Sequence, residues 1–118
     1  MGEDTRRDDL PAGDLLIPVT SLEQAEAVMR AHEAVILYFT AAGCNVCQAV
    51  KPRVIALSEQ YRVPMLLAAI DETTAFSAQR LVFTIPTVLI LFQGREVARE
   101  SRFINFEQLE RTLSLLKD

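Results

Sequence analysis

Residues 40–48 read Thr-Ala-Ala-Gly-Cys-Asn-Val-Cys-Gln and contain both cysteines of the chain, Cys44 and Cys47. They lie between an apolar run at residues 34–39 (AVILYF) and a long amphipathic segment that reaches Tyr61. A run without polar alternation is typical of a strand that is covered on both faces. Apolar residues at steps of three or four after Cys44 predict a helix. The two cysteines therefore open a helix directly after a buried strand.

The composition is that of one domain that can fold without a stabilising disulfide. The chain has 118 residues, and 50% of them are apolar, which is enough for a hydrophobic core. A disulfide between Cys44 and Cys47 would close so short a loop that it removes little entropy from the unfolded chain. A structural role is therefore a weak explanation for the pair. We expect the domain at residues 14–118, preceded by a flexible polar arm at residues 1–13.

Charge and hydropathy argue against two classes of partner. The net charge is −4, and the 12 basic residues are scattered rather than gathered into the positive surface that phosphate backbones require. The longest apolar runs fall far short of the roughly 20 residues of a membrane-spanning helix. The first ten residues, MGEDTRRDDL, are charged and lack the apolar centre of a secretory signal. We therefore expect a cytoplasmic protein that binds neither nucleic acid nor membrane.

Strands and helices alternate on both sides of the cysteine motif. The sequence predicts strands at residues 14–19, 34–39, 63–70, 87–92 and 96–100. It predicts helices at residues 20–31 and 44–61, a shorter helix that ends near residue 82, and a last helix that is capped by Asn105. Strands joined by helices imply parallel crossovers, and the last two strands form an antiparallel hairpin. The expected fold class is α/β, a mixed central sheet with helices on both faces.

Three chemical roles are open to Cys44 and Cys47. At a helix N-terminus, unpaired N–H groups and the positive end of the helix dipole favour a thiolate on Cys44 and lower its pKa from the reference of roughly 8.5. Cys47, one turn later, can then attack a mixed disulfide on Cys44. A zinc site needs about four ligands, and the chain adds one histidine, His32. We expect no metal, but a dimer that shares four cysteines and a pair of inert buried cysteines both stay open.

The chain resembles the thioredoxin family over roughly residues 14–116. The similarity rests on residues 36–47 (ILYFTAAGCNVC), on Pro52 five residues after Cys47, and on residues 83–97 (FTIPTVLILFQGREV). It implies a thioredoxin-like fold and a thiol-disulfide oxidoreductase that needs no bound cofactor. The implied substrates are disulfide-bearing proteins or small thiols. A thioredoxin-reductase-like protein or a small thiol would restore the dithiol, and we expect a monomer or a weak dimer.

The resemblance also assigns roles around the cysteines. It makes Cys44 the attacking nucleophile and Cys47 the resolving thiol. Gly43 stands where thioredoxins usually carry Trp, and Asn45 and Val46 replace their usual Gly-Pro pair. We expect these three residues to shape the site, and Asn45 and Val46 to tune its redox potential, because the residues between the cysteines tune thiolate stability.

A proline segment is expected to complete the site. Ile85-Pro86 is similar to the cis-proline site of the family, which packs against the dithiol. By this resemblance, the backbone of Ile85 pairs with an extended segment of the substrate. Val46, Ile85 and Phe83 would form an apolar rim around the nucleophile, or Phe83 would pack into the core instead.

Two departures remove the buried proton relay of the family. Thioredoxins bury an Asp six residues before the first cysteine and a Lys on the next strand, and these positions hold Tyr38 and Leu67. We expect Tyr38 to act as a substitute proton relay, or to lie in the core with its hydroxyl bonded to the backbone. A positioned base typically accelerates a reaction by about 10² to 10⁴. The loss of such a base predicts either a slow enzyme or an adaptor module with little turnover. Ile85 before the proline resembles reducing thioredoxins, so we expect the enzyme to reduce disulfides.

Overall fold

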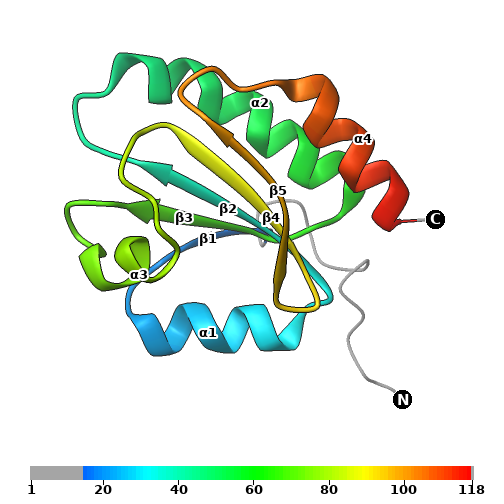
Figure 1. Ribbon diagram of the computed structural model, residues 1–118, viewed down its shortest axis with the longest axis horizontal. Helices are drawn as coiled ribbons and strands as arrows, with labels where there is room; N and C mark the ends of the chain where they lie inside the picture. The colour runs from blue at the N-terminus through cyan, green and yellow to red at the C-terminus, as the bar shows by residue number, and fades with distance from the viewer. Residues whose placement is uncertain (1–14, 118) are drawn as a thin grey trace.

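Within residues 15–117, nine elements follow one another in the order β-α-β-α-β-α-β-β-α (Figure 1), as predicted. The structure is a computed structural model that describes residues 15–117. The strands are β1 (Leu16–Pro18), β2 (Ala34–Thr40), β3 (Met65–Ala69), β4 (Thr87–Phe92) and β5 (Arg95–Ser101). The helices are α1 (Leu22–Ala31), α2 (Asn45–Tyr61), α3 (Thr74–Gln79) and α4 (Phe106–Leu116). The arm expected at residues 1–13 lies outside the described residues, and so does Asp14.

The five strands form one mixed sheet in the order β1-β3-β2-β4-β5. β1, β3 and β2 are parallel, whereas β4 is antiparallel to β2 and β5 is antiparallel to β4. The predicted mixed sheet with a C-terminal hairpin is confirmed, but the expected parallel crossover into β4 is wrong. The chain between β3 and β4 leaves and re-enters the sheet at the same edge, so β4 begins where β3 ended.

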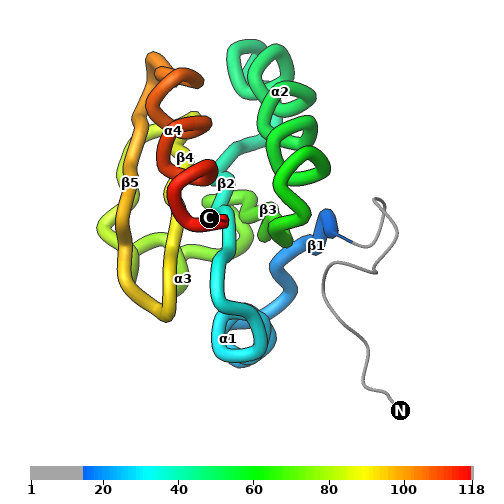
Figure 2. The backbone as a smooth tube through the Cα atoms, turned by 90° about the vertical axis from the view of Figure 1, so that its right-hand side faces the viewer, coloured from blue at the N-terminus to red at the C-terminus, as the bar shows by residue number. Residues whose placement is uncertain are grey.

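Helices cover both faces of the sheet (Figure 2). α1 and α3 cover one face, and α2 and α4 cover the other (Figure 1). Along β2, Leu37 and Phe39 belong to the core under α1 and α3, whereas Ile36 and Tyr38 belong to the core under α2 and α4. Burial on both faces explains why this strand lacks polar alternation. Tyr38 consequently faces the helix that carries the cysteines.

Side-chain caps set where three of the helices begin. Ser21 Oγ accepts the N–H of Gln24 at 3.0 Å before α1, and Asn105 Oδ1 accepts the N–H of Gln108 at 3.1 Å before α4. Cys44 is the N-cap of α2, the longest helix, which has 17 residues. Within residues 15–117, none of the helices combines the length and the hydropathy required to cross a bilayer.

One edge of the sheet brings together the segments that the sequence analysis assigned to the site. β2 and β3 end at this edge, β4 begins there, and β5 ends there. Phe39 pairs with Thr87 in the register of β2 and β4, so the loop after Thr40 lies beside the segment that ends at Pro86. The cysteine loop and the proline segment, which are about 40 residues apart in the chain, therefore meet in the fold.

Candidate active site

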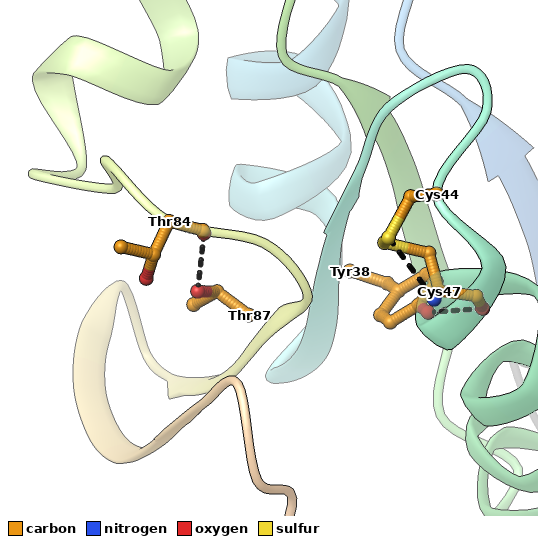
Figure 3. The surroundings of a disulfide bond; sticks show 5 residues. All are labelled: Tyr38, Cys44, Cys47, Thr84 and Thr87. Atoms are coloured by element: carbon orange, nitrogen blue, oxygen red, sulfur yellow. Dashed lines mark hydrogen bonds between the residues drawn. A yellow bond between two sulfur atoms is a disulfide. The ribbon is translucent and has the colours of Figure 1, made fainter.

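Cys44 and Cys47 form a disulfide at the N-terminus of α2 (Figure 3). Their Cα atoms are 5.2 Å apart. Cys47 is 1% exposed in the first turn of the helix, whereas Cys44 is partly exposed. A sulfur of another molecule can therefore reach Cys44 but not Cys47. This difference in access is what a nucleophile and a resolving thiol require.

The backbone around Cys44 favours negative charge on its sulfur. Cys44 Sγ accepts the N–H of Cys47 at 3.1 Å. In the reduced protein the same N–H would stabilise a thiolate, together with the positive end of the helix dipole. Gly43 precedes the cap with φ = +79°, in the left-handed region that favours glycine. Gly43 thus supplies the turn from β2 into the helix.

Tyr38 is fully buried in β2 and points toward the first turn of α2 (Figure 3). Its hydroxyl donates a 2.6 Å hydrogen bond to the backbone carbonyl of Cys47. Burial raises the pKa of the phenol to about 12, so the hydroxyl keeps its proton at neutral pH. The proton is directed at a carbonyl rather than at a sulfur. Of the two arrangements expected for Tyr38, this is the one with the hydroxyl bonded to the backbone.

Leu67 of β3 lies directly opposite Tyr38 in the register of β2 and β3. Both side chains contact the core between the sheet and α2. The two positions at which thioredoxins carry the Asp and the Lys of the relay are therefore neighbours in space. They hold one hydroxyl, which bonds to the Cys47 carbonyl, and one aliphatic side chain, so neither position offers a carboxylate for proton transfer.

The segment before β4 is held by three polar contacts. The Ile85–Pro86 peptide bond is cis, and the buried Pro86 accepts the N–H of Arg102 on its carbonyl at 2.7 Å. Thr87 donates its hydroxyl to the carbonyl of Thr84 at 2.8 Å (Figure 3). The same hydroxyl lies 3.0 Å from that of a serine at the end of β5. Ile85 stays partly exposed in this fixed segment, next to the loop that holds the cysteines.

A second anchor holds the start of the same segment. The guanidinium of Arg99, in β5, donates to the carbonyls of Arg80 and Leu81 at 2.7 and 3.0 Å. Glu96 accepts two hydrogen bonds from this guanidinium at 2.7 and 2.9 Å, and these bonds lower the pKa of the Glu96 carboxyl. The segment between α3 and β4 is thus fastened at both ends. No local sequence pattern predicts this clamp of Arg99 on the carbonyls of Arg80 and Leu81, because the partners are about 19 residues apart.

Large apolar side chains are exposed along this edge. Val46 is 56% exposed and Phe83 is 75% exposed, so Phe83 does not pack into the core. Asn45, between the cysteines, is exposed as well. Phe103 is 87% exposed in the loop after β5. The sequence analysis missed Phe103, since an apolar residue next to a helix cap reads equally well as core.

His32 lies at the other end of β2 from the cysteines. It follows α1 and precedes β2, whereas Cys44 follows β2. It therefore cannot join the two sulfurs in a single coordination sphere within one chain. In the part of the chain that the structure describes, no group of three or more His, Cys, Asp or Glu side chains is arranged to hold a metal ion.

Fold and site together define a class of protein. A mixed sheet of this topology, with a disulfide-forming Cys-x-x-Cys pair at a helix N-terminus, is the architecture of thioredoxin-like thiol-disulfide oxidoreductases. The thioredoxin family profile matches residues 16–114, and the chain belongs to this family.

Relatives and solved structures agree with this membership. A thioredoxin-like protein of Bacillus subtilis (YdfQ) is 33% identical over 94 residues, which cover 79% of this chain and 84% of that protein. The mitochondrial thioredoxin O of rice is 30% identical over 108 residues, 86% of this chain and 62% of that protein. A mutant thioredoxin from Halobacterium salinarum superposes with a TM-score of 0.82 at 20% identity, covering 98% of this chain and 97% of its own. The chain is a thiol-disulfide oxidoreductase of the thioredoxin family.

Proposed function

We propose that this oxidoreductase reduces disulfides in other proteins, with Cys44 as the nucleophile and Cys47 as the resolving thiol. The Cys44 thiolate attacks one sulfur of the partner's disulfide, forms a mixed disulfide, and releases the partner's other sulfur as a thiolate. The Cys47 thiolate then attacks Cys44 Sγ, forms the intramolecular disulfide, and releases the partner's second sulfur. Two electrons pass to the partner, and the two protons of the original dithiol end on the partner's sulfurs.

The observation that carries this proposal is the unequal access to the two sulfurs. Cys44 is partly exposed and its Sγ accepts a helix N–H, whereas Cys47 is buried within disulfide reach of it. The first sulfur can meet a partner, and the second can meet only the first. Such an arrangement favours release of the substrate over accumulation of the mixed disulfide.

The substrate would bind along the segment that ends at Pro86. An extended strand of the partner can pair with the backbone of Ile85, as in β-augmentation, while Gly43, Asn45 and Val46 border its disulfide. The hydrogen bonds at Thr87 and at the carbonyl of Pro86 support this role, since they hold the segment in place before a substrate arrives.

The cycle requires an external electron donor. We propose that a thioredoxin-reductase-like protein or a small thiol returns two electrons to the disulfide. For the same reason we propose the cytoplasm as the working compartment, because such donors keep thiols reduced there. A monomer is sufficient for the reaction, since both sulfurs and the proline segment come from one chain.

Tyr38 would position Cys47 rather than transfer its proton. The hydroxyl holds the Cys47 carbonyl at 2.6 Å, and a phenol with a pKa of about 12 stays protonated throughout the working pH range. Deprotonation of Cys47 then depends on water or on the thiolate that the partner releases. This supports a slower resolving step than a nearby carboxylate would give.

Serine variants test the assignment. With insulin as the disulfide substrate and dithiothreitol as the electron donor, Cys44→Ser should reduce insulin no faster than dithiothreitol alone. Cys47→Ser should lose turnover but accumulate a mixed disulfide that mass spectrometry detects after alkylation. If Cys44→Ser keeps the wild-type rate, the assignment of the nucleophile is wrong.

A further inference from the structure

The last strand of the sheet, β5, has one open side. It pairs with β4 and stands at the end of the strand order β1-β3-β2-β4-β5 within residues 15–117 (Figure 2). Arg102 donates its N–H to the Pro86 carbonyl at 2.7 Å. By the alternation of an antiparallel ladder, the N–H and C=O of Arg99 then point away from β4. An edge strand of seven residues is a template on which another strand can pair.

The charged side chains of β5 are divided between the two faces of the sheet. Arg95 and Glu100 lie on the face that α2 and α4 cover, as their partners in β4 show. Glu96 and Arg99 lie on the face that α1 and α3 cover. Residues three or five apart would point to opposite faces of a regular strand. A β-bulge leaves Val97 without a partner in β4 and brings each pair of opposite charges to one face.

The order of these charges is self-complementary when two copies of β5 run antiparallel. Residues 95–100 read Arg-Glu-Val-Ala-Arg-Glu. One register places Arg95 opposite Glu100 of the second copy. The same register places Glu96 opposite Arg99 of the second copy, and the valine and alanine between them meet at the centre. Each pair occurs twice by two-fold symmetry, so every charge within residues 95–100 meets an opposite charge on its own face.

The two neighbouring registers do not fit. A shift of one residue in one direction sets Arg95 opposite Arg99 of the second copy. A shift in the other direction sets Glu96 opposite Glu100 of the second copy. Both shifts pair like charges, and both bring together side chains that point to different faces. Charges and bulges at an edge usually prevent strand pairing, and here they permit one register of the three.

We propose that a second copy of this chain pairs with β5 along residues 95–100 and joins the two five-stranded sheets into one. β5 ends at the edge of the sheet that carries the dithiol, and the strand of the second copy runs in the opposite direction. The two dithiols therefore lie at opposite ends of the joined sheet, and both stay open to substrates. The dimer is weak, because six residues per chain form a small interface. This inference goes beyond the proposed function, which one chain performs.

Charge reversal at the outer pair tests the register. Arg95→Glu and Glu100→Arg each set like charges opposite each other in a homodimer. Each substitution should raise the dissociation constant in sedimentation equilibrium about tenfold or more. An equimolar mixture of the two variants should restore dimerisation, because the two glutamates of one chain then face the two arginines of the other. A chain with both substitutions should dimerise as wild type does. Glu59→Arg, at an exposed position on α2, is the matched control and should change nothing.

A second variant keeps the test decisive. Glu100 also accepts the N–H of Asn105 at 3.2 Å, so urea unfolding must show that Glu100→Arg is folded. Val97→Asp, at a 46% exposed position, brings two carboxylates close to the two-fold axis and should also weaken the dimer. Wild type that stays monomeric at about millimolar concentration would overturn the proposal. A dimer that neither charge reversal weakens, or reversals that the mixture does not rescue, would overturn it as well.

A small probe separates this inference from the redox function. Bis(2-hydroxyethyl) disulfide reaches Cys44 in monomer and dimer alike, so every folded variant should reduce it at the wild-type rate. A dimerisation defect with an unchanged rate supports the pairing of β5. A rate that falls together with dimerisation would overturn the arrangement with two independent, open dithiols. Failure of wild type to reduce the probe would contradict the proposed function itself and leave the dimer measurement intact.

Discussion

Tyr38 places a single buried hydroxyl against the backbone of the dithiol. Its proton is bonded to the carbonyl of Cys47, and its pKa of about 12 lies far above the working range. We therefore expect Tyr38→Phe to leave the pH dependence of insulin reduction between pH 6 and 9 unchanged. A shifted pH profile would show that the phenol does relay a proton. The variant should lose about 1 kcal/mol of unfolding free energy, the usual contribution of one buried hydrogen bond.

The alkaline stability of the same variant provides an independent check. The raised pKa of Tyr38 means that its contribution is fully present below the unfolded value of about 10 and is lost as pH rises through about 12. Wild type should therefore lose unfolding free energy over this interval, and Tyr38→Phe should lose less. Urea unfolding at pH 9 and pH 11 measures the difference. Parallel losses in the two proteins would contradict the assigned burial of the phenol.

At the scale of the helix, the N-terminus of α2 should activate Cys44. The N–H of Cys47 and the helix dipole both stabilise a thiolate at this cap, so we expect the pKa of Cys44 to lie below the free-cysteine reference of roughly 8.5. The pH dependence of iodoacetamide alkylation of the reduced protein measures it. Cys47→Ser serves as the comparison, because it leaves Cys44 as the only thiol. An ordinary pKa would mean that the helix terminus does not activate the sulfur.

The clamp between β5 and the end of α3 should govern substrate binding rather than chemistry. Arg99→Gln removes the donors to the carbonyls of Arg80 and Leu81 and frees the segment that leads to Pro86. We expect a several-fold higher KM for insulin, an unchanged rate with bis(2-hydroxyethyl) disulfide, and a loss of about 1 kcal/mol of unfolding free energy. An unchanged KM would show that the segment stays in place without the clamp.

Acid unfolding checks the role of Glu96 in the clamp. The bonds from Arg99 lower the pKa of the Glu96 carboxyl from its ordinary value of 4.5. Stability from this pair is therefore present above about pH 4.5 and is lost as pH falls through the lower value of the folded state. Glu96→Gln should remove this part of the pH dependence while retaining a weaker clamp. The same acid transition in both proteins would count against the pair as a source of stability.

For the whole molecule, patterns within short stretches predicted most of the fold. The unbroken apolar run of β2 and the cap at Asn105 were both readable in the sequence. The direction of β4 was not, because its antiparallel pairing with β2 is a contact between distant segments that no residue pattern within β4 reports. Phe103 could not be placed either, since its exposure follows from the left-handed turn at Arg102. Contacts between segments that are distant in the sequence decide such features, and local periodicity does not report these contacts.

The direction of the reaction is also a property of the whole fold. A protein that reduces others must be more stable in its disulfide form than in its dithiol form. A preference of about 1.4 kcal/mol for the disulfide form corresponds to about 30 mV of reduction potential. Cys44 and Cys47 have a sequence separation of three, so their disulfide raises the free energy of unfolding through chain entropy by only about 2 kcal/mol. We therefore expect the free energy of unfolding of the oxidised form to exceed that of the reduced form by about 2 kcal/mol. Both forms should remain folded in water. Urea unfolding in both redox states measures this difference, with Cys44→Ser and Cys47→Ser together as a variant that should not respond to reductant. A more stable reduced form would make the chain an oxidant, because the fold would then favour removal of its own disulfide.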